Sequence, residues 1–400
     1  MIDLASRLAT TRKVVNVAKG VAKDAIRPTS PTSIDEVPAS ASAITPAWAT
    51  AALCPEGRAR VVDVRVVSVS DGTSGRSRLH LTYEGEPAAI ADLPPTVFVK
   101  HAPSFGNRMQ VGVTGAIWAE SRFYRDVRPL IPDLRAPWGW FGASDRTSGR
   151  AVVLMEDMDR TRGDVRYGDI REVHTTRAMA ESVVDNLATL HGSFLGSDRL
   201  GQDLRWIISS KALQVHLNTA VNVERRTLVG FDRAKDVIPG TLLPRRNDVQ
   251  PGLMRALELD ARGPVGIVHT DVHSGNWFIE GGERMGLFDW AAMARGQGAR
   301  DLAYALMSAL TIEDRRAWEG ELIDRYAERV GEVSGRPQVR DDVWTAYRRQ
   351  TLHGFGYWLY TLGQGVLQPT MQPDEISLTN IERMAQAVLD LETFAALEGV

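Results

Sequence analysis

The sequence has few cysteines, no long apolar runs and no excess of charge of one sign. Its single cysteine, Cys54, excludes an internal disulfide framework and fits a reducing compartment, so we expect a cytoplasmic protein. No apolar run is long enough to span a bilayer, and the N-terminus lacks the apolar core of a secretory signal. The formal net charge of -3 at pH 7 does not indicate a nucleic-acid partner.

The N-terminal residues 1–27 alternate basic and apolar side chains in a pattern that predicts a basic amphipathic helix. Such a helix could lie on an anionic membrane. A terminal helix is more often mobile or docked on its own protein, and we favour that interpretation over membrane contact. Residues 28–43 are rich in Pro, Ser, Thr and Ala, which predicts a linker. Residues 1–44 are therefore assigned to a terminal helix and linker.

The rest of the chain is organised around residues 265–305. Residues 265–268 form an apolar run that suits a buried strand. Two further apolar runs, residues 277–279 and 285–288, flank a Gly-Gly turn and predict a hairpin. The second strand of this hairpin delivers Asp289 at its end.

The polar residues of this region have the spacing of a phosphoryl-transfer site. Asp271 and Asn276 are five positions apart, like the Asp and Asn of the kinase loop H-R-D-x-x-x-x-N. Asp289 stands where a kinase has the magnesium-bridging Asp of D-F-G, but Trp290 and Ala291 follow it. Magnesium-bound phosphates need hard oxygen ligands, and a hydroxyl nucleophile needs a positioned carboxylate. Taken singly, each residue is more often structural; taken together between apolar strands, they favour catalysis.

Three neighbouring residues have structural alternatives. His269 is a candidate catalytic residue, and it could equally be a hydrogen-bonded core histidine that braces the loop. His273 could be a surface residue. Asp301 could be a solvated helix residue or the N-cap of the helix that follows.

The combined pattern His-x-Asp-x-His-x-x-Asn, then Asp-Trp, then Arg-Asp-Leu-Ala-Tyr resembles the aminoglycoside phosphotransferase and choline kinase superfamily, not the protein kinases. The chain is most similar to the ecdysteroid-kinase-like (CHK-kinase-like) branch, from Thr45 onward. Thr270 replaces the usual glycine of that family and Val272 its common leucine; neither change removes a functional group. The further segments that carry the resemblance are residues 78–83, 97–100, 120–124 and 154–157.

This resemblance implies an α+β, bilobal protein-kinase-like fold, with a small β-rich N-lobe and a larger, mainly helical C-lobe. It also implies phosphorylation of small-molecule hydroxyl groups with ATP and magnesium. We expect residues 45–155 to form the nucleotide-binding lobe, and residues 156–400 to hold the catalytic loop and the acceptor site.

A second predicted hairpin lies in the N-lobe, where two alternating runs flank a Gly/Ser turn. In a kinase-like lobe, backbone N–H groups of such a turn contact nucleotide phosphates. Gly72, Ser74 and Gly75 are therefore candidate nucleotide-binding residues, although most turns of this kind bind nothing.

Lys100 ends an apolar strand, and Glu120 follows twenty residues later in a stretch with helical spacing. The lysine could simply be solvated, but we favour an ion pair that positions the α- and β-phosphates. A buried strand at residues 151–155 leads into the expected hinge. Backbone groups there would contact the adenine edge, which leaves ATP versus GTP open; the candidates are Glu156, Asp157 and Met158.

The acceptor site is less clear from the sequence. Residues 173–194 predict a long core helix, whereas residues 201–259 look less regular and carry aromatic and basic side chains that suit an acceptor pocket. Residues 348–362 are unusually aromatic. Most of these aromatic side chains are expected in the core, and one or two would line an apolar acceptor site.

The predicted function is a small-molecule kinase that transfers the γ-phosphate of ATP to a hydroxyl of an apolar or ring-bearing acceptor. Asp271 would accept or orient the proton, while Asn276 and Asp289 would hold magnesium. One alternative is a catalytically silent nucleotide-binding module, and another is a protein recruited to membranes through residues 1–27. A hydrolase is disfavoured, because the sequence has neither a G-x-S-x-G nor an H-E-x-x-H motif.

Overall fold

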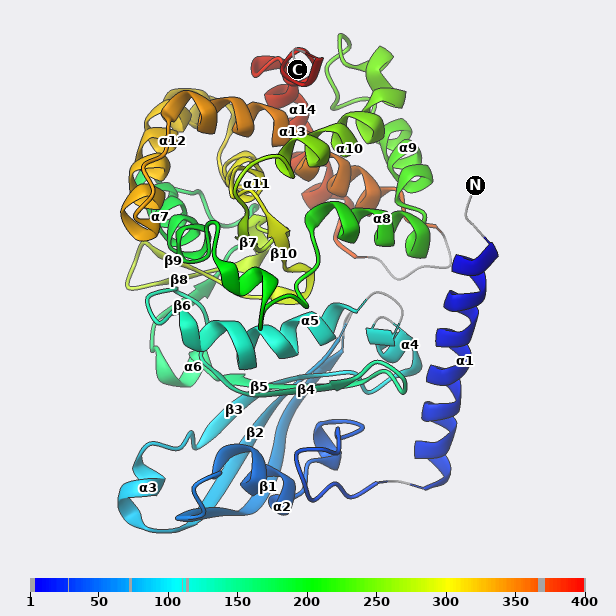
Figure 1. The fold of residues 1–400 in the computed structure, drawn as a ribbon, viewed down its shortest axis with the longest axis vertical. Coiled ribbons are helices and arrows are strands. Elements are labelled where there is room, and N and C mark those ends of the chain that lie inside the picture. The colour runs from blue at the N-terminus through cyan, green and yellow to red at the C-terminus, as the bar shows by residue number, and fades with distance from the viewer. Residues whose placement is uncertain are drawn as a thin grey trace. The chain divides into compact units, whose positions relative to one another are not determined.

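The structure is a computed structural model that describes residues 4–27, 29–71, 74–109, 111–112, 115–365 and 371–398. The chain divides into two compact units. The first contains Met1–Pro132, Ala136–Asp164 and Asp289–Ala292; the second contains Asp133–Arg135, Val165–Phe288 and Met293–Val400. The first is rich in strands and the second mainly helical, which confirms the predicted α+β class (Figure 1). The predicted boundaries of the functional lobes, after residues 44 and 155, stay a prediction.

An antiparallel five-stranded sheet forms the centre of the first unit. Its strand order is β1-β2-β3-β5-β4. The hairpin predicted around the Gly/Ser turn of the N-lobe is confirmed, since β1 pairs with β2. Lys100 lies near the end of β3, as expected. The strand bounds are Ala59–Asp71 for β1, Gly75–Gly85 for β2, Thr96–His101 for β3, Gly139–Asp145 for β4 and Arg150–Glu156 for β5.

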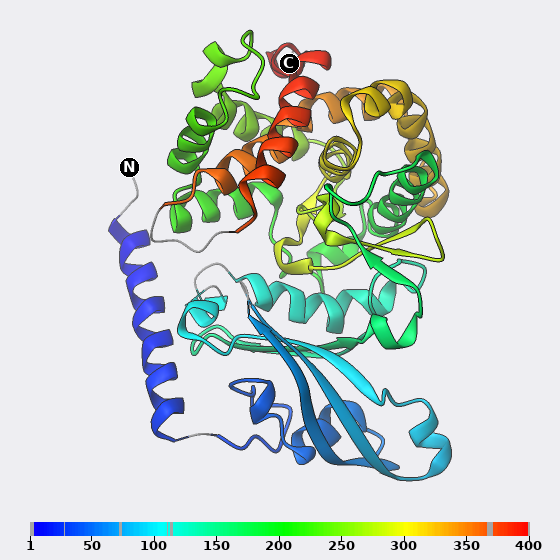
Figure 2. The same cartoon turned by 180° about the vertical axis from the view of Figure 1, so that it is seen from behind.

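Helix α5 (Ala116–Arg122) lies along this sheet and continues into a π-helical turn, η3 (Phe123–Val127) (Figure 2). Gly142 of β4 allows the close approach, because a Cβ atom there would lie 2.2 Å from the backbone oxygen of Ser121. This packing fixes the position of Glu120 on α5. Besides α1, which is described below, the first unit contains the α-helices α2 (Pro46–Leu53), α3 (Pro87–Ala91), α4 (Phe105–Met109) and α6 (Met158–Thr161).

The predicted N-terminal helix is confirmed as α1 (Leu4–Ile26), and it is docked on the first unit. Val17 is fully buried, and Asp24 forms ion pairs with Arg108 and Arg150. The described part of the predicted linker, residues 29–43, contains only the short turn η1 (Ala41–Ala43) between α1 and α2, and its role as a linker stays a prediction. Ala41 joins the core around α2, and Trp48 Nε1 donates to the backbone oxygen of Glu36 at 2.8 Å. Small and polar residues can pack closely when a large neighbour offers a surface and hydrogen-bond partners.

The second unit is built from nine α-helices in its described residues. The predicted helix over residues 173–194 is confirmed as α7, although it begins later because Thr176 caps it. The bounds are α7 Arg177–Ser193, α8 Ser210–Val221, α9 Val223–Arg233, α10 Val249–Asp260, α11 Ala299–Ala309, α12 Ile312–Ser334, α13 Arg340–Leu362, α14 Asp374–Asp390 and α15 Thr393–Glu398. None of the helices in the described part of the chain is long and apolar enough to cross a membrane.

Residues 201–259 are more regular than expected, because they contain α8, α9 and α10. These helices are short, at 12, 11 and 12 residues, so each offers only a few turns of apolar periodicity between the polar connections of the region. Tertiary packing contributes most of the stability of helices this short. Gly230 of α9 lets this helix approach α13 closely, since a Cβ atom would lie 1.8 Å from the backbone oxygen of Leu359.

Short strands frame the central loop of the second unit. The predicted strand at residues 265–268 is confirmed as β7 (Gly266–Val268), which pairs with β10 (Ala294–Gly296). The predicted hairpin is confirmed as β8 (Trp277–Glu280) and β9 (Arg284–Leu287), with β6 (Val165–Tyr167) paired to β8. Residues 269–276 therefore connect two anchored strands.

One buried carboxylate near this frame should make stability depend on pH. Asp260 accepts from the backbone N–H of Gln297 at 3.0 Å, and burial raises its pKa from 3.8 to about 6. A raised carboxylate pKa means that its stabilising, protonated form is present below about pH 4 and is lost as pH rises through about 6. The rise corresponds to roughly 3 kcal/mol.

We therefore expect Asp260→Asn to be more stable than the natural protein at pH 7.5 and to lose this advantage at pH 4. The neighbouring Gln350 can turn its amide to match, because its Oε1 has no hydrogen-bond partner among the described residues. Urea unfolding of both proteins at several pH values would measure the difference. A difference that stays constant with pH would contradict the prediction.

Candidate active site

Lys100 lies between two carboxylates in the first unit. Its Nζ is 2.7 Å from Glu120 Oε2 and 2.7 Å from Asp289 Oδ1. Lys100 and Glu120 are buried, whereas the side chain of Asp289 is 26% exposed. Burial disfavours the charged amine, but the carboxylates of Asp289 and Glu120 outweigh this effect and hold the pKa of Lys100 above its ordinary value. The lysine is therefore a fixed cation beside a partly accessible carboxylate.

The Asp-Trp segment is anchored to α5 and the turn after it. Trp290 stacks on Phe123 with 3.8 Å between ring centroids and an interplanar angle of 7°. Its backbone N–H donates to the Glu120 carboxylate. The tryptophan that replaces the Phe of D-F-G thus holds Asp289 beside Lys100. The sequence shows this residue but not its stacking partner.

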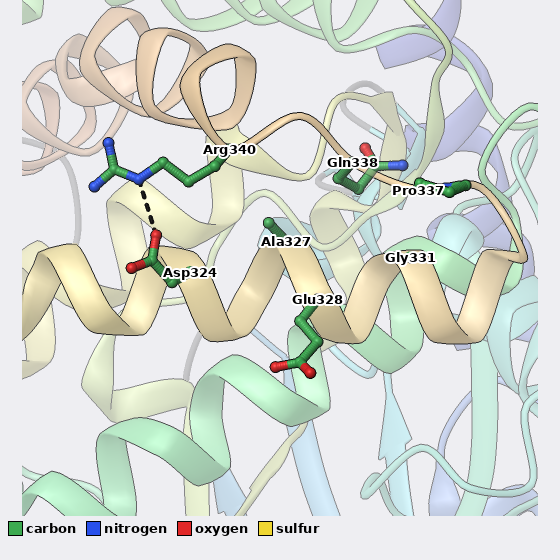
Figure 3. A pocket seen from close by; sticks show the side chains of 7 residues that line it. All are labelled: Asp324, Ala327, Glu328, Gly331, Pro337, Gln338 and Arg340. Carbon is green, nitrogen blue, oxygen red and sulfur yellow. Dashed lines mark hydrogen bonds and ion pairs between the residues drawn. The ribbon is translucent and has the colours of Figure 1, made fainter.

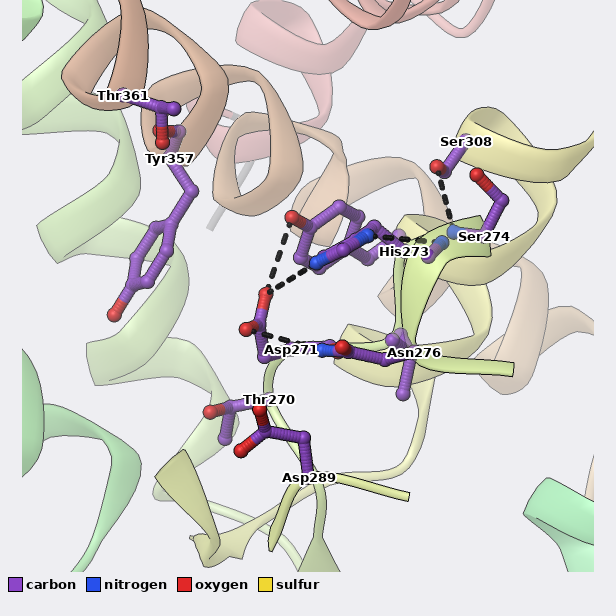
Figure 4. A network of polar contacts seen from close by, with 12 residues as sticks. Thr270, Asp271, His273, Ser274, Asn276, Asp289, Ser308, Tyr357 and Thr361 are labelled. Atoms are coloured by element: carbon purple, nitrogen blue, oxygen red, sulfur yellow. Dashed lines mark hydrogen bonds and ion pairs between the residues drawn. The ribbon is translucent and has the colours of Figure 1, made fainter. Parts of the chain in front are cut away.

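Asp271 and Asn276 meet in the loop of the second unit (Figure 4). Asn276 Nδ2 donates to the backbone oxygen of Asp271 at 2.8 Å and to its Oδ2 at 3.2 Å. The side chain of Asp271 is 36% exposed. Because the amide nitrogen of Asn276 is directed at Asp271, its oxygen is the atom suited to a cation.

His269 links the start of this loop to the end of the β8–β9 hairpin. It is buried, its Nε2 donates to the backbone oxygen of Phe288 at 3.0 Å, and its Nδ1 accepts from the backbone N–H of Asp271 at 3.3 Å. These contacts match the bracing interpretation. A direct catalytic role for His269 stays a prediction.

Asp301 is the main brace of the loop, so both sequence interpretations of this residue are wrong. It is fully buried in the first turn of α11, and the N-cap of that helix is Gly298. Its carboxylate accepts from the backbone N–H groups of His269 at 2.6 Å and Thr270 at 2.9 Å. Burial favours its neutral form, but the hydrogen bond and charge of His191 and the charge of His269 outweigh this and lower its pKa.

Tyr304 and His273 flank the Asp271 carboxylate. The Tyr304 hydroxyl donates to Oδ1 at 3.4 Å, and His273 Nε2 lies 3.9 Å from the same oxygen. His273 Nδ1 accepts from the backbone N–H of Gly275, so the ring is part of the loop and is not merely a surface group. Asp301 and Tyr304 are three residues apart on one face of α11, and this helical spacing is the sequence signal for Tyr304.

Thr270 occupies the left-handed backbone region with φ of 70°, which a β-branched residue rarely adopts. The glycine usual at this place would adopt it without strain. Contacts on both sides hold Thr270 there: its N–H donates to Asp301, and His353 Nε2 donates to its carbonyl oxygen at 2.7 Å. The surroundings of the loop therefore hold Thr270 in a strained conformation.

We expect Thr270→Gly to be more stable than Thr270→Ala by about 0.5–1 kcal/mol, since only alanine carries the Cβ strain. This order is opposite to the usual one, in which alanine is the more stable of the two. Chemical unfolding of the matched pair would measure it. A more stable alanine variant would mean that the left-handed conformation is not imposed.

Two of the three predicted phosphate-contacting residues, Ser74 and Gly75, lie in the described part of the chain. Gly72 lies outside the described residues. Ser74 is buried and its Oγ has no hydrogen-bond partner in the described ranges. A Cβ atom on Gly75 would lie 2.7 Å from Pro103, so this glycine is needed for packing against the next loop.

The predicted hinge residues use their side chains within the first unit. Asp157 is buried and binds Arg78 Nε at 2.6 Å and Nη2 at 2.7 Å. Glu156 pairs with Arg162 at 2.7 Å, and its backbone N–H donates to Trp138. Met158 begins α6 and is buried. Their carboxylates therefore have structural partners, which leaves backbone groups as the candidates for nucleotide contact.

No group of three or more His, Cys, Asp and Glu side chains that could hold a metal ion occurs in the ranges that the structure describes. Magnesium at phosphoryl-transfer sites commonly binds one or two side-chain oxygens together with substrate phosphates. The amide oxygen of Asn276 and the carboxylate of Asp289 are hard ligands of this kind. Their donor chemistry fits magnesium.

A separate surface pocket of about 510 Å³ lies along α12 and the start of α13 (Figure 3). Its lining residues include Asp324, Glu328 and Arg340, and Arg340 pairs with Asp324 at 2.8 Å. None of the predicted site residues lines it. It therefore has no part in the catalytic loop.

Three solved structures illustrate what the chain is similar to. A Ralstonia eutropha protein assigned as an aminoglycoside phosphotransferase has 15% identity and a TM-score of 0.51, over 82% of this chain and 92% of that one. Choline kinase LicA from Streptococcus pneumoniae has 13% identity and a TM-score of 0.42, over 82% and 94%. Plasmodium vivax ethanolamine kinase has 10% identity and a TM-score of 0.43, over 80% and 81%.

The first of these similarities supports the fold, and it confirms the predicted protein-kinase-like class. No curated protein matches the chain. Residues 116–341, more than half of the chain, match a family described as the phosphotransferase enzyme family, APH. The predicted superfamily is thereby confirmed, while the CHK-kinase-like branch stays a prediction. The chain belongs to the APH phosphotransferase enzyme family.

Proposed function

We propose that this phosphotransferase transfers the γ-phosphate of ATP to a hydroxyl group of a small molecule. The observation that carries the proposal is the loop carboxylate Asp271, which is accessible and is held by Asn276 and Tyr304. A carboxylate that is both fixed and open to solvent can accept a proton from a bound alcohol.

Asp271 acts on the acceptor. Its Oδ2 accepts a hydrogen bond from Asn276, and its Oδ1 accepts one from Tyr304. Each carboxylate oxygen can accept one more hydrogen bond. The acceptor oxygen attacks the γ-phosphorus, the bond from that phosphorus to the β-phosphate oxygen breaks, and ADP leaves. The hydroxyl proton passes to Asp271.

Lys100 acts on the nucleotide. As a buried cation fixed by Glu120, it is suited to hold the α- and β-phosphates. Gly72, Ser74 and Gly75 would cover the phosphates, and the backbone of residues 156–158 would contact the base. Most of the acceleration comes from positioning and electrostatics, because phosphoryl transfer requires little covalent help from the protein.

Asn276 and Asp289 are the proposed magnesium ligands, and bound magnesium would neutralise charge on the phosphate oxygens. We further propose a cytoplasmic protein without a nucleic-acid partner, acting on an apolar or ring-bearing alcohol. The buried Val17 and the ion pairs of Asp24 support α1 as a docked helix and speak against membrane contact through residues 1–27.

The test is ATP consumption with magnesium across a panel of sterols, aminoglycosides, choline-like amines, sugars and hydroxy acids. Acceptor-dependent ADP release would support the proposal and identify the acceptor class. Nucleotide binding with no release for any acceptor would favour the alternative, a silent nucleotide-binding module. No nucleotide binding at all would overturn both.

A further inference from the structure

Helix α13 presents a line of polar aromatic side chains that begins at the catalytic loop. His353 contacts Thr270, and Tyr357 and Tyr360 follow at helical spacing on the same side of the helix. Figure 4 shows Tyr357 on the opposite side of Asp271 from Ser274. Burial raises the pKa of Tyr357 to about 12; Arg300 opposes the rise and the carboxylate of Asp271 adds to it, which places Tyr357 within electrostatic range of Asp271.

Arg226 of α9 lies at the far end of this line. Its Cζ is 3.6 Å from the centroid of the Tyr360 ring, a close cation–π contact. Its Nη2 donates to the sulfur of Met371 at 3.5 Å, which is a weak acceptor. Its Nε is buried without a hydrogen-bond partner among the described residues. Burial lowers the pKa of Arg226, and Tyr360 only partly opposes this effect.

Two other buried arginines, Arg128 and Arg315, each bind strong acceptors, although Arg315 Nε and two nitrogen atoms of Arg300 also lack a partner among the described residues. Arg128 donates to three backbone carbonyl groups, including that of Ile131 at 2.7 Å. Arg315 binds the carboxylates of Glu319 and Asp390. No ion pair of Arg226 occurs in the described part of the chain. A guanidinium that is half-buried and lacks an oxyanion partner is expensive unless a ligand supplies one.

Helix α13 adds no carboxylate beside Arg226. The sequence contains no Asp or Glu between Asp342 and Asp374, so α13 brings no carboxylate to this line. Asp271 is required for the chemistry. A cationic acceptor would therefore find no further counter-charge on α13, whereas an anionic one would find Arg226. Tyr360 is seven residues beyond His353, which corresponds to about 10 Å along the helix.

We propose that Arg226 binds an anionic group of the acceptor. The acceptor is then an aromatic or apolar alcohol that carries a carboxylate or another oxyanion about 10 Å from the reacting hydroxyl. Stacking on Tyr360 holds the guanidinium plane, and its edge can bind an oxyanion through two N–H groups. This inference rests on the proposed function, because it takes Asp271 as the site of the hydroxyl.

The test compares two probes that differ only in charge. One is a biphenyl with a hydroxymethyl group at one end and a carboxylate at the other; its partner has a carboxamide in place of the carboxylate. Calorimetric titration into the full-length protein with magnesium and a non-hydrolysable ATP analogue measures both affinities. We expect the acid to bind about tenfold to a hundredfold more tightly than the amide, as hydrogen bonds to a charged group allow.

Arg226→Gln should abolish this preference, and Arg226→Lys should reduce it because lysine lacks the planar fork. Arg225→Gln is the matched control: it removes an exposed arginine next along α9, and the preference should remain. Thermal unfolding shows whether each variant is folded. Equal affinities in the natural protein, including no binding of either probe, would overturn the inference. So would a preference that survives Arg226→Gln.

The two proposals can fail separately. The protein could prefer the acid in a way that depends on Arg226 and yet transfer no phosphoryl group to any alcohol. That result would support the anion site and reject the kinase function. Transfer to neutral alcohols without any acid preference would support the kinase and reject the role of Arg226.

Discussion

Asp271→Asn is expected to lower turnover by about 10³-fold, within the range that a positioned general base contributes. The amide has nearly the shape of the carboxylate, so the contacts to Asn276 and Tyr304 can largely persist, but it cannot take up the hydroxyl proton. Steady-state rates of ADP release, with the acceptor that the panel identifies, would measure the loss. The affinity for magnesium nucleotide should remain within a few-fold of the natural value.

Tyr304→Phe provides the control for this variant. It removes a long hydrogen bond of 3.4 Å to Asp271 and leaves the carboxylate in place. A modest loss of turnover is therefore expected. If Asp271→Asn retained turnover close to that of the natural protein, Asp271 would not be the base, and the assignment of the loop would fail.

Asp301→Asn is expected to cost about 3 kcal/mol of unfolding free energy and most of the activity. The buried carboxylate accepts from His191 Nε2 at 3.2 Å and from the N–H groups of His269 and Thr270. The NH₂ group of an asparagine would face at least one of these N–H donors. Two buried hydrogen-bond donors would then point at each other without an acceptor. The strained Thr270 would also lose the partner that holds its backbone.

Urea unfolding and turnover should both be measured for Asp301→Asn. Asp260→Asn is the matched control, because it neutralises another buried carboxylate of the same unit and is expected to stabilise the protein at neutral pH. If both variants lost equal stability, the loss would reflect burial of an amide and not the bracing of the catalytic loop.

Much of the fold could be predicted from local sequence patterns. Strand β7 and the β8–β9 hairpin appear within one residue of their predicted bounds, because strong apolar runs and turn signals mark them. The helices α8, α9 and α10 are not separately predicted, because each is only 11 or 12 residues long and polar connections interrupt the pattern of the region.

The candidate site shows the same division. The spacing of Asp271, Asn276 and Asp289 indicates their chemistry, because a known reaction needs those groups in that order. Asp301 could not be assigned from sequence alone. Helical spacing gives the face on which a side chain lies, but not the distant backbone that it meets. The strain at Thr270 likewise becomes visible only from its dihedral angle.

The docking of α1 has a practical consequence for anyone who shortens this chain. Asp24 is the shared acceptor of Arg108 and Arg150, and both arginines come from other elements of the first unit. A recombinant fragment that begins at Thr45 would leave these two cations without their carboxylate and would uncover the surface that Val17 fills. Poor solubility of such a fragment would then reflect a removed piece of the folded body, not a failure of the remaining sequence to fold.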